Sequence, residues 1–121
     1  MAKTVMVVDD DPFILMAVEK FLKLKGLQVM TFNDPAQAYE TAEKKKPDLI
    51  ISDIAMPNID GLTLLKALKS NKATQHIPLA LLTATDKIAD VEKGFDSGAQ
   101  AYIIKPLDWD RAWAKIEPLL K

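Results

Sequence analysis

Five short runs of hydrophobic residues recur along the chain at fairly even intervals. Several of them are continuous rather than alternating, which is typical of strands buried on both faces of a sheet. We therefore expect strands near residues 5–8, 27–32, 49–51, 79–82 and 101–104.

Between these runs, hydrophobic residues repeat with the spacing of an amphipathic helix. Pro12 and Pro35 suit a first helical turn, and Gly26 suits a helix end. Pro118 falls in the last predicted turn and is expected to disrupt it. We expect five helices, over residues 12–25, 34–46, from 61 onward, 86–96 and 108–119.

A strand followed by a helix, five times over, predicts an α/β fold. The helices are long enough to serve as crossovers between parallel strands, and such crossovers are right-handed. We expect a three-layer, doubly wound sandwich around a five-stranded parallel sheet, forming one domain over residues 1–121. In such sheets ligands bind outside the carboxyl ends of the strands, so these ends are where chemistry is expected.

Composition excludes several classes of function. Lys and Arg number 16 against 17 Asp and Glu, which argues against binding nucleic acid or a membrane surface through overall charge. The absence of cysteine excludes disulfides and thiol catalysis, and the single histidine, His76, excludes histidine clusters. No hydrophobic run approaches the roughly 18 residues of a membrane span, and the N-terminus does not resemble a signal peptide. We expect a cytoplasmic protein with no membrane insertion.

Acidic residues follow two of the predicted strands. Asp9, Asp10 and Asp11 come directly after the first strand, and Asp53 ends the third. If these strands are neighbours, three carboxylates converge, and each unpaired like-charge pair at about 4 Å costs about 4 kcal/mol at an effective dielectric constant of 20. A hard divalent cation relieves this repulsion, and the lack of histidine or thiol ligands favours Mg²⁺ or Mn²⁺. Asp11 precedes Pro12 and is expected to cap the first helix instead.

The remaining strand ends carry Thr83 and Lys105. Alone, the first would be an ordinary strand residue and the second an ordinary surface charge. Their joint placement with the acids is what favours a functional interpretation.

Taken together, these blocks resemble the response-regulator receiver domains of two-component signalling over the whole chain. The blocks that carry the resemblance are Val7-Val8-Asp9-Asp10-Asp11, Asp53 with Met56-Pro57-Asn58-Ile59-Asp60-Gly61, Thr83-Ala84, Gly98-Ala99 and Lys105-Pro106. Each block is weak by itself, but all occur in order and most lie at predicted strand ends.

The resemblance implies a flavodoxin-like fold with strand order 2-1-3-4-5 and a phosphoacceptor at Asp53. The phosphoryl group would come from a phosphohistidine on a histidine kinase or phosphotransfer protein. Mg²⁺ would be held by Asp9, Asp10, Asp53 and the backbone carbonyl of Ala55. Thr83 and Lys105 would contact phosphoryl oxygens, and the Lys105-Pro106 peptide is expected to be cis.

The resemblance also implies a switch rather than an enzyme. Thr83 would move toward the phosphoryl group and Tyr102 would respond, changing the surface of the fourth helix, fifth strand and fifth helix. Catalysis would be limited to self-phosphorylation from small donors and self-dephosphorylation. The downstream partner is unknown but is expected to be a protein, with no direct contact to nucleic acid.

Two hydrophobic features remain open to two interpretations. The first helix is apolar over more of its surface than a single core-facing stripe requires, which indicates either a well-buried helix or a docking patch that includes Phe13. Trp113 is expected in the core, whereas Trp109, placed near Tyr102, is a candidate partner contact. A monomer or weak dimer is expected.

Two other functions compete with the receiver interpretation. A metal-dependent aspartyl phosphatase acting on small phosphate esters would need Asp-x-Asp-x-Thr or Asp-x-Asp-x-Val, but Phe13 occupies the last position. A flavin-binding electron carrier would need a Ser/Thr/Gly-rich phosphate loop where this chain has three acids. The chain ends at Lys121, directly after the last predicted helix, so we expect either a stand-alone regulator or one domain of a longer one.

Overall fold

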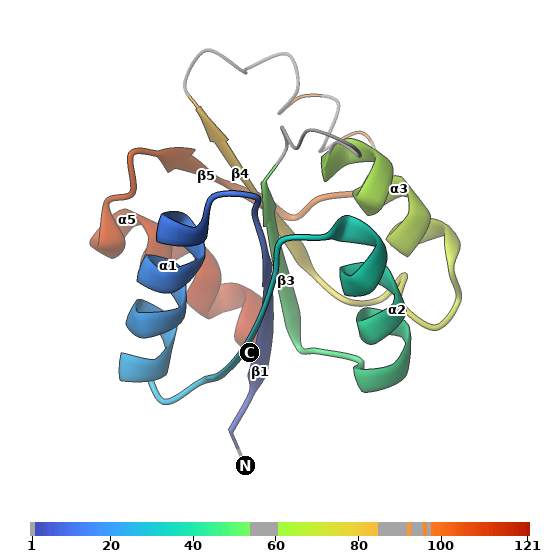
Figure 1. Ribbon diagram of the computed structural model, residues 1–121, viewed down its shortest axis with the longest axis horizontal. Coiled ribbons are helices and arrows are strands. Elements are labelled where there is room, and N and C mark those ends of the chain that lie inside the picture. The colour runs from blue at the N-terminus through green and yellow to red at the C-terminus, as the bar shows by residue number, and fades with distance from the viewer. Residues whose placement is uncertain (1, 54–60, 85–91, 93–95, 97) are drawn as a thin grey trace.

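A single five-stranded parallel sheet forms the centre of the molecule (Figure 1). The computed structural model describes residues 2–53, 61–84, 92, 96 and 98–121. The strand order is β2-β1-β3-β4-β5, as the resemblance implied. The strands are β1 Thr4–Val8, β2 Gln28–Phe32, β3 Leu49–Asp53, β4 Leu79–Ala84 and β5 Ala101–Lys105.

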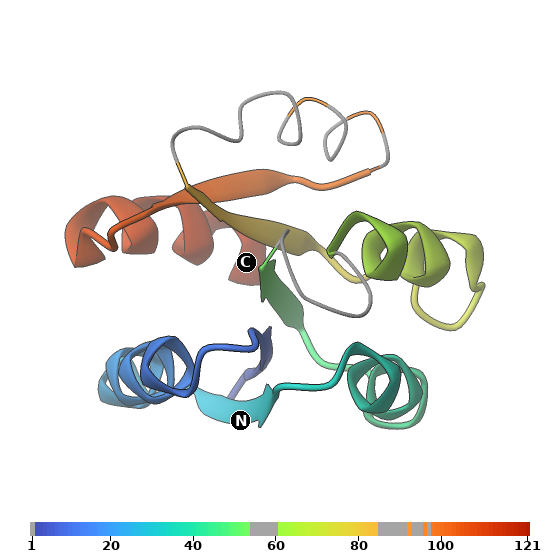
Figure 2. The same cartoon turned by 45° about the horizontal axis from the view of Figure 1, so that its top comes forward.

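Helices cover both faces of this sheet, which gives the three layers expected from the sequence. α1 and α5 lie on one face, and α2 and α3 lie on the other (Figure 2). The described helices are α1 Pro12–Leu24, α2 Pro35–Lys45, α3 Gly61–Ser70 and α5 Trp109–Ile116, followed by the 3-10 helix η1 Glu117–Leu120. The helix expected over 86–96 falls almost entirely outside the described residues.

Aspartate side chains begin three of the helices. Asp11, Asp34 and Asp108 each accept a hydrogen bond from the backbone N–H two residues ahead, which satisfies an otherwise unpaired donor of the first turn. Helix ends follow the sequence as well, because Gly26 after α1 has φ +83°, a conformation that glycine adopts without strain. Pro118 ends regular α-helix at Ile116 and leaves a 3-10 turn.

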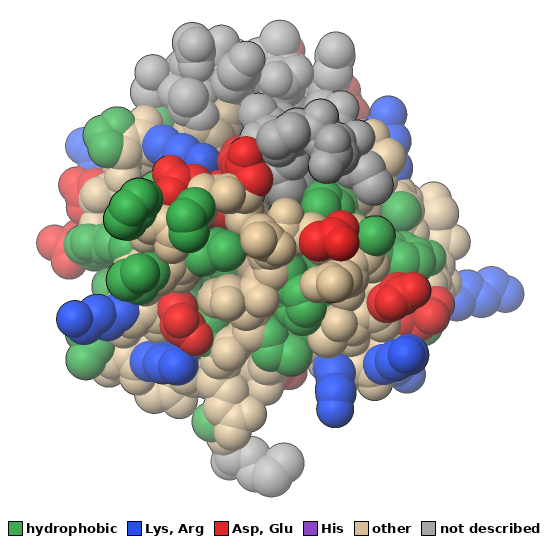
Figure 3. All heavy atoms as spheres, in the orientation of Figure 1, with side chains coloured by type: hydrophobic (Ala, Val, Ile, Leu, Met, Phe, Trp, Pro, Cys, Tyr) green, Lys and Arg blue, Asp and Glu red, His purple; other side chains and the backbone are tan. Residues whose placement is uncertain are grey.

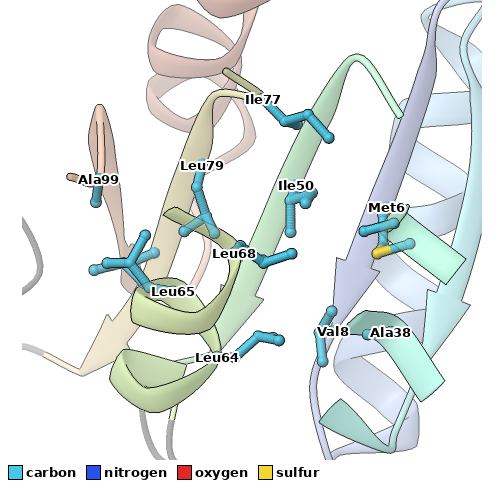
Figure 4. Packing of buried hydrophobic residues seen from close by; sticks show 12 residues of the cluster. Met6, Val8, Ala38, Ile50, Leu64, Leu65, Leu68, Ile77, Leu79 and Ala99 are labelled. Atoms are coloured by element: carbon cyan, nitrogen blue, oxygen red, sulfur yellow. The ribbon is translucent and has the colours of Figure 1, made fainter. Parts of the chain in front are cut away.

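Two hydrophobic clusters fill the space between the sheet and the two helix layers. The cluster between the sheet and the α2–α3 layer includes Met6, Ile50 and Leu65 (Figure 4). The other cluster, which includes Val7 and Leu22, lies between the sheet and the α1–α5 layer. All five residues of β3 are buried, as its continuous hydrophobic run predicted.

The register of the strands brings the polar strand ends to one edge of the sheet. Val8 at the end of β1 pairs with Ser52 of β3, and Asp53 pairs with Leu82 of β4. Thr83 of β4 in turn pairs with Ile104 of β5. Lys105 is the last residue of β5 rather than the first residue beyond it, because this strand is one residue longer than expected.

Candidate functional site

Three carboxylates meet at the carboxyl edge of the sheet. Asp9 follows β1, and Asp53 ends the neighbouring strand β3, so both lie at the point where strand order reverses. Asp10 lies beside them, and one oxygen from each of the three carboxylates lies within 4.8 Å of the others. Asp9 is fully buried, Asp53 is 6% exposed, and Asp10 is exposed. The sequence correctly predicted this convergence, although Asp9 and Asp53 are 44 residues apart in the chain.

Lys105 brings a single positive charge to this group. Its Nζ lies 3.2 Å from Oδ2 of Asp9 and 3.2 Å from Oδ2 of Asp53. β5 is not adjacent to β1 or β3 in the sheet, so the reach of the long lysine side chain across β4 makes these contacts. The peptide bond from Lys105 to Pro106 is cis, as expected.

Asp9 carries the least favourable electrostatic environment of the three acids. The pKa of its carboxyl is raised from 3.8 to about 6. Burial is the largest cause and the charge of Asp53 adds to it, whereas the hydrogen bond from the Asp11 N–H and the charge of Lys105 act in the opposite direction. Oδ1 accepts a hydrogen bond from the backbone N–H of Asp11 at 3.0 Å. Within the described part of the chain, Oδ2 is buried with an ion-pair partner but no hydrogen-bond donor in suitable geometry.

The lysine is stabilised in its charged form by the same pair of acids. Burial is the largest single effect and lowers the pKa of Lys105, but attraction to Asp9 and Asp53 outweighs it, so the pKa lies above its usual value. Lys105 therefore stays protonated at neutral pH. Among the described residues, one cation faces three acids, which leaves this cluster with an excess of negative charge when all three are ionised.

The donor set fits a hard divalent cation. All three side chains offer oxygen ligands, the spacing of the carboxylates allows them to converge on one ion, and the buried Oδ2 of Asp9 has no hydrogen-bond partner within the described part of the chain. Mg²⁺ and Mn²⁺ suit such ligands, as the sequence indicated. Ala55, whose backbone carbonyl was expected to complete the ligand set, lies outside the described residues.

Two further residues of the predicted site lie on β4 and β5. Thr83 is buried one residue before the end of β4, on the same edge as the acids. Tyr102 is half-buried on β5 and packs against the cluster of the α2–α3 layer. Lys115 of α5 donates to the backbone carbonyl of Tyr102 at 2.8 Å, and its Nζ lies 4.1 Å from the centre of the tyrosine ring. No pattern in the sequence marks this lysine, because only the packing of α5 on β5 brings the two residues together.

The structure separates the two interpretations of the first helix. Phe13 is 78% exposed, so α1 is not buried around its whole circumference. Trp109 is half-buried, and its ring stacks on Phe21 of α1 with the ring centres 4.7 Å apart. It belongs to the cluster of the α1–α5 layer, whereas Tyr102 packs in the cluster on the opposite face of the sheet. Trp113 packs in the same cluster as Trp109, as expected for a core residue.

Comparison with known proteins identifies the family. The family model of the response regulator receiver domain matches residues 5–117, and the chain therefore belongs to this family. Its fold and the place of its acidic cluster agree with that assignment. Membership makes phosphorylation-dependent signalling in two-component systems the general role of this domain.

Curated relatives are regulators longer than this chain. The chain is 36% identical over 117 residues to the DNA-binding dual master transcriptional regulator RpaA of Synechocystis sp., covering 97% of this chain and 48% of RpaA. It is 34% identical over 121 residues to the alkaline phosphatase synthesis transcriptional regulatory protein PhoP of Bacillus subtilis, covering 100% of this chain and 50% of PhoP. The chain thus spans about half the length of these relatives.

Two solved structures match this chain over nearly the full length of both chains. A putative response regulator from Chloroflexus aurantiacus superposes with a TM-score of 0.94 at 30% identity, covering 99% of this chain and 98% of that one. The chemotaxis response regulator CheY4 of Vibrio cholerae gives a TM-score of 0.91 at 28% identity, covering 99% of this chain and all of CheY4. Among the described residues, no helix is both long enough and apolar enough to cross a membrane.

Proposed function

We propose that Asp53 is the phosphoacceptor of this receiver domain and that its phosphorylation switches the binding of a partner protein. The observation that carries the proposal is the position of the Asp53 carboxylate, beside two other acids and 3.2 Å from the Lys105 ammonium. Asp53 is the acid that can act as the nucleophile, because Asp9 is fully buried and Asp10 follows β1 as an exposed ligand. The residue is 6% exposed, which leaves its carboxylate accessible from the edge of the sheet.

The reaction is a transfer of one phosphoryl group. A carboxylate oxygen of Asp53 attacks the phosphorus of a phosphohistidine on a histidine kinase or phosphotransfer protein. The new oxygen–phosphorus bond forms as the nitrogen–phosphorus bond breaks, and the donor imidazole leaves with the electron pair and takes up a proton. The product is an acyl phosphate that carries roughly −1.5 to −2 charge. The domain itself turns over no substrate beyond transfer from small phosphate donors and hydrolysis of its own acyl phosphate.

Charge neutralisation decides whether this transfer is feasible. Asp9, Asp10 and Asp53 would hold Mg²⁺ together with the backbone carbonyl of Ala55, and the bound cation supplies positive charge to the phosphoryl oxygens. Before the reaction Lys105 forms ion pairs with Asp9 and Asp53. Once the phosphoryl group is attached to Asp53, Lys105 pairs with a phosphoryl oxygen instead. Thr83 donates its hydroxyl to another phosphoryl oxygen from the end of β4.

The switch follows from the movement of Thr83 and Tyr102. Thr83 is drawn toward the new dianion, and Tyr102 on the adjacent strand β5 responds by changing its packing. Signalling is then a shift in population between two arrangements of the surface around β5 and α5, which binds a downstream protein.

A cytoplasmic location is part of this proposal. We propose that residues 1–121 fold as this single receiver domain, whatever else accompanies it.

The alternative of an aspartyl phosphatase has less support. Its sequence pattern fails at Phe13, whose side chain is 78% exposed at the first turn of α1 and offers no hydrogen bond. The family assignment also favours a regulator over a phosphatase.

Labelling with a small phosphate donor tests the proposed function. Acetyl phosphate with Mg²⁺ should add the mass of one phosphoryl group to the native chain, and chelation of the metal should prevent it. Asp53→Ala should gain no mass, whereas Asp48→Ala, which removes an exposed aspartate at the opposite end of β3, should gain it as the native chain does. A gain without metal, or an equal gain in Asp53→Ala, would contradict the proposal.

A further inference from the structure

We propose that the outer face of α1 binds the same face of a second copy of this chain, with the two helices antiparallel. The outer face of α1 consists of Phe13, Ala17, Lys20 and Leu24. These residues follow one another at i, i+4, i+7 and i+11, so they form one stripe along the helix. The stripe lies opposite the buried side of α1, which carries Val18 and Leu22. The inference goes beyond phosphorylation and does not depend on it.

Hydrophobic exposure on this face is concentrated at its two ends. Phe13 is 78% exposed near the start of α1, and Leu24 is 80% exposed at its end. Met16 beside them is 62% exposed. Of the large hydrophobic residues exposed in the described chain, only Ile104 lies outside α1. Burial of two such side chains per copy provides a driving force for association.

A groove runs beside this stripe and gives it a shape that can receive a side chain. The groove has a volume of about 300 Å³ and lies between α1 and the start of α5. Its lining residues are Ala17, Lys20, Phe21, Leu24 and Trp109. The stacked rings of Phe21 and Trp109 make it mostly apolar. An aromatic ring from another molecule is an occupant of suitable chemistry, and Phe13 is such a ring.

The charges along α1 favour a second copy of the same chain as the partner. Asp10 and Asp11 are exposed at the start of the helix, whereas Lys23 and Lys25 are exposed at its end. Figure 3 shows hydrophobic side chains over α1, with acidic side chains beyond one end and basic ones at the other. Antiparallel pairing places the acidic end of each helix against the basic end of the other and also aligns the helix dipoles favourably.

The face is complementary to itself under a two-fold axis. With the axis passing between Val18 and Glu19, Phe13 of each copy meets Leu24 of the other, next to the groove. In such an isologous contact each favourable pair of residues occurs twice, and the assembly is complete with two copies. A net charge of −1 leaves little overall repulsion between copies.

The dimer is expected to be weak. α1 has 13 residues and is about 20 Å long, so one helix pair buries less than the roughly 800 Å² per partner of a stable interface. Association should therefore depend on concentration in the range from about 10 µM to about 1 mM.

Sedimentation of the full chain over that concentration range tests the proposal. The mass should rise from 13.4 kDa toward twice that value. Leu24→Glu and Phe13→Glu should each weaken dimerisation at least tenfold, and because both side chains are exposed their melting temperatures should change little. Ile104→Glu, which alters an exposed hydrophobic residue on β5, serves as the control and should dimerise as the native chain does. A monomer at every concentration, or a dimer lost only in Ile104→Glu, overturns the proposal.

Cross-linking tests the antiparallel arrangement. The chain has no cysteine, so Phe13→Cys and Leu24→Cys each introduce a single reactive thiol. A short bis-maleimide should link a mixture of the two variants more efficiently than either variant alone. Efficient linking of Phe13→Cys to itself would indicate parallel helices and overturn the arrangement. If Leu24→Glu instead slows phosphoryl transfer from a donor protein and no dimer forms, the face belongs to the donor and the proposal fails.

Discussion

At the scale of single residues, Asp9 is held where its charge is costly. It is fully buried, it lies beside Asp53, and its pKa is raised to about 6 by burial first and by the neighbouring charge second. Lys105 offsets part of this cost through its ion pairs with both acids. A side chain kept ionisable in such a place is typical of a functional site, where stability is given up for chemistry.

Replacing Asp9 by Asn should therefore stabilise the metal-free protein at neutral pH. Because the pKa in the folded state lies above the ordinary value of 3.8, the native chain loses stability as the pH rises through about 6. Asp9→Asn lacks this loss, so its free energy of unfolding should exceed that of the native chain by about 3 kcal/mol above pH 7.

Denaturant unfolding in the presence of a chelator measures this difference. The two proteins should have similar stability near pH 4, where Asp9 of the native chain is protonated. Glu40→Gln, which removes an exposed carboxylate on α2, is the matched control and should follow the native chain at both pH values. An Asp9→Asn protein that is less stable than the native chain above pH 7 would contradict this account of the site.

At the scale of elements, capping side chains fix where helices begin. Asp34 lies before α2, and its Oδ1 accepts a hydrogen bond from the N–H of Ala36 at 2.9 Å. Pro35 occupies the first helical position, where its missing N–H costs nothing. The start of α2 is thus set by two adjacent residues.

Asp34→Ala should lower the free energy of unfolding by about 1 kcal/mol, because the N–H of Ala36 loses its partner. Thermal unfolding measures this loss, and phosphoryl labelling of Asp53 should be unchanged. Gln37→Ala, an exposed substitution within the same helix, should leave stability nearly unaffected. An equal effect of the two substitutions would show that the cap does not set the start of α2.

The elements also show why some features could be predicted from the sequence and others could not. Strands, caps and the Asp9–Asp53 convergence follow from local patterns together with the rule that parallel strands end at one edge. The contact of Lys115 with Tyr102 and the stack of Trp109 on Phe21 depend on how α5 is rotated against the sheet and α1. No local pattern encodes that rotation, so the sequence placed Trp109 near Tyr102, although they pack in clusters on opposite faces of the sheet.

At the scale of the whole molecule, a cation bound at the acidic site would couple to the stability of the fold. The acids that would bind a cation directly follow β1 or end β3, so a cation bound there would hold together two strands that are distant in sequence. A ligand that binds only the folded state raises the free energy of unfolding. Once the ligand concentration exceeds the dissociation constant, this gain grows with the logarithm of the concentration.

Mg²⁺ should therefore raise the melting temperature of the native chain. At a concentration 100 times its dissociation constant the gain is about 2.7 kcal/mol. Differential scanning fluorimetry at increasing Mg²⁺ gives the shift, and Asp10→Asn should reduce it strongly because an exposed ligand is lost while the core is untouched. Asp110→Asn, an exposed acid on α5, is the control and should retain the full shift. Equal shifts in the two variants would place the cation elsewhere.

Locating the modified residue shows directly whether the phosphoryl group resides on Asp53. The chain is phosphorylated with Mg²⁺, the acyl phosphate is reduced with borohydride, and the altered residue is found by peptide mass spectrometry. We expect Asp53 to be reduced to homoserine in the native chain, with Asp9 and Asp10 unmodified. Modification of Asp9 or Asp10 in place of Asp53 would contradict this expectation.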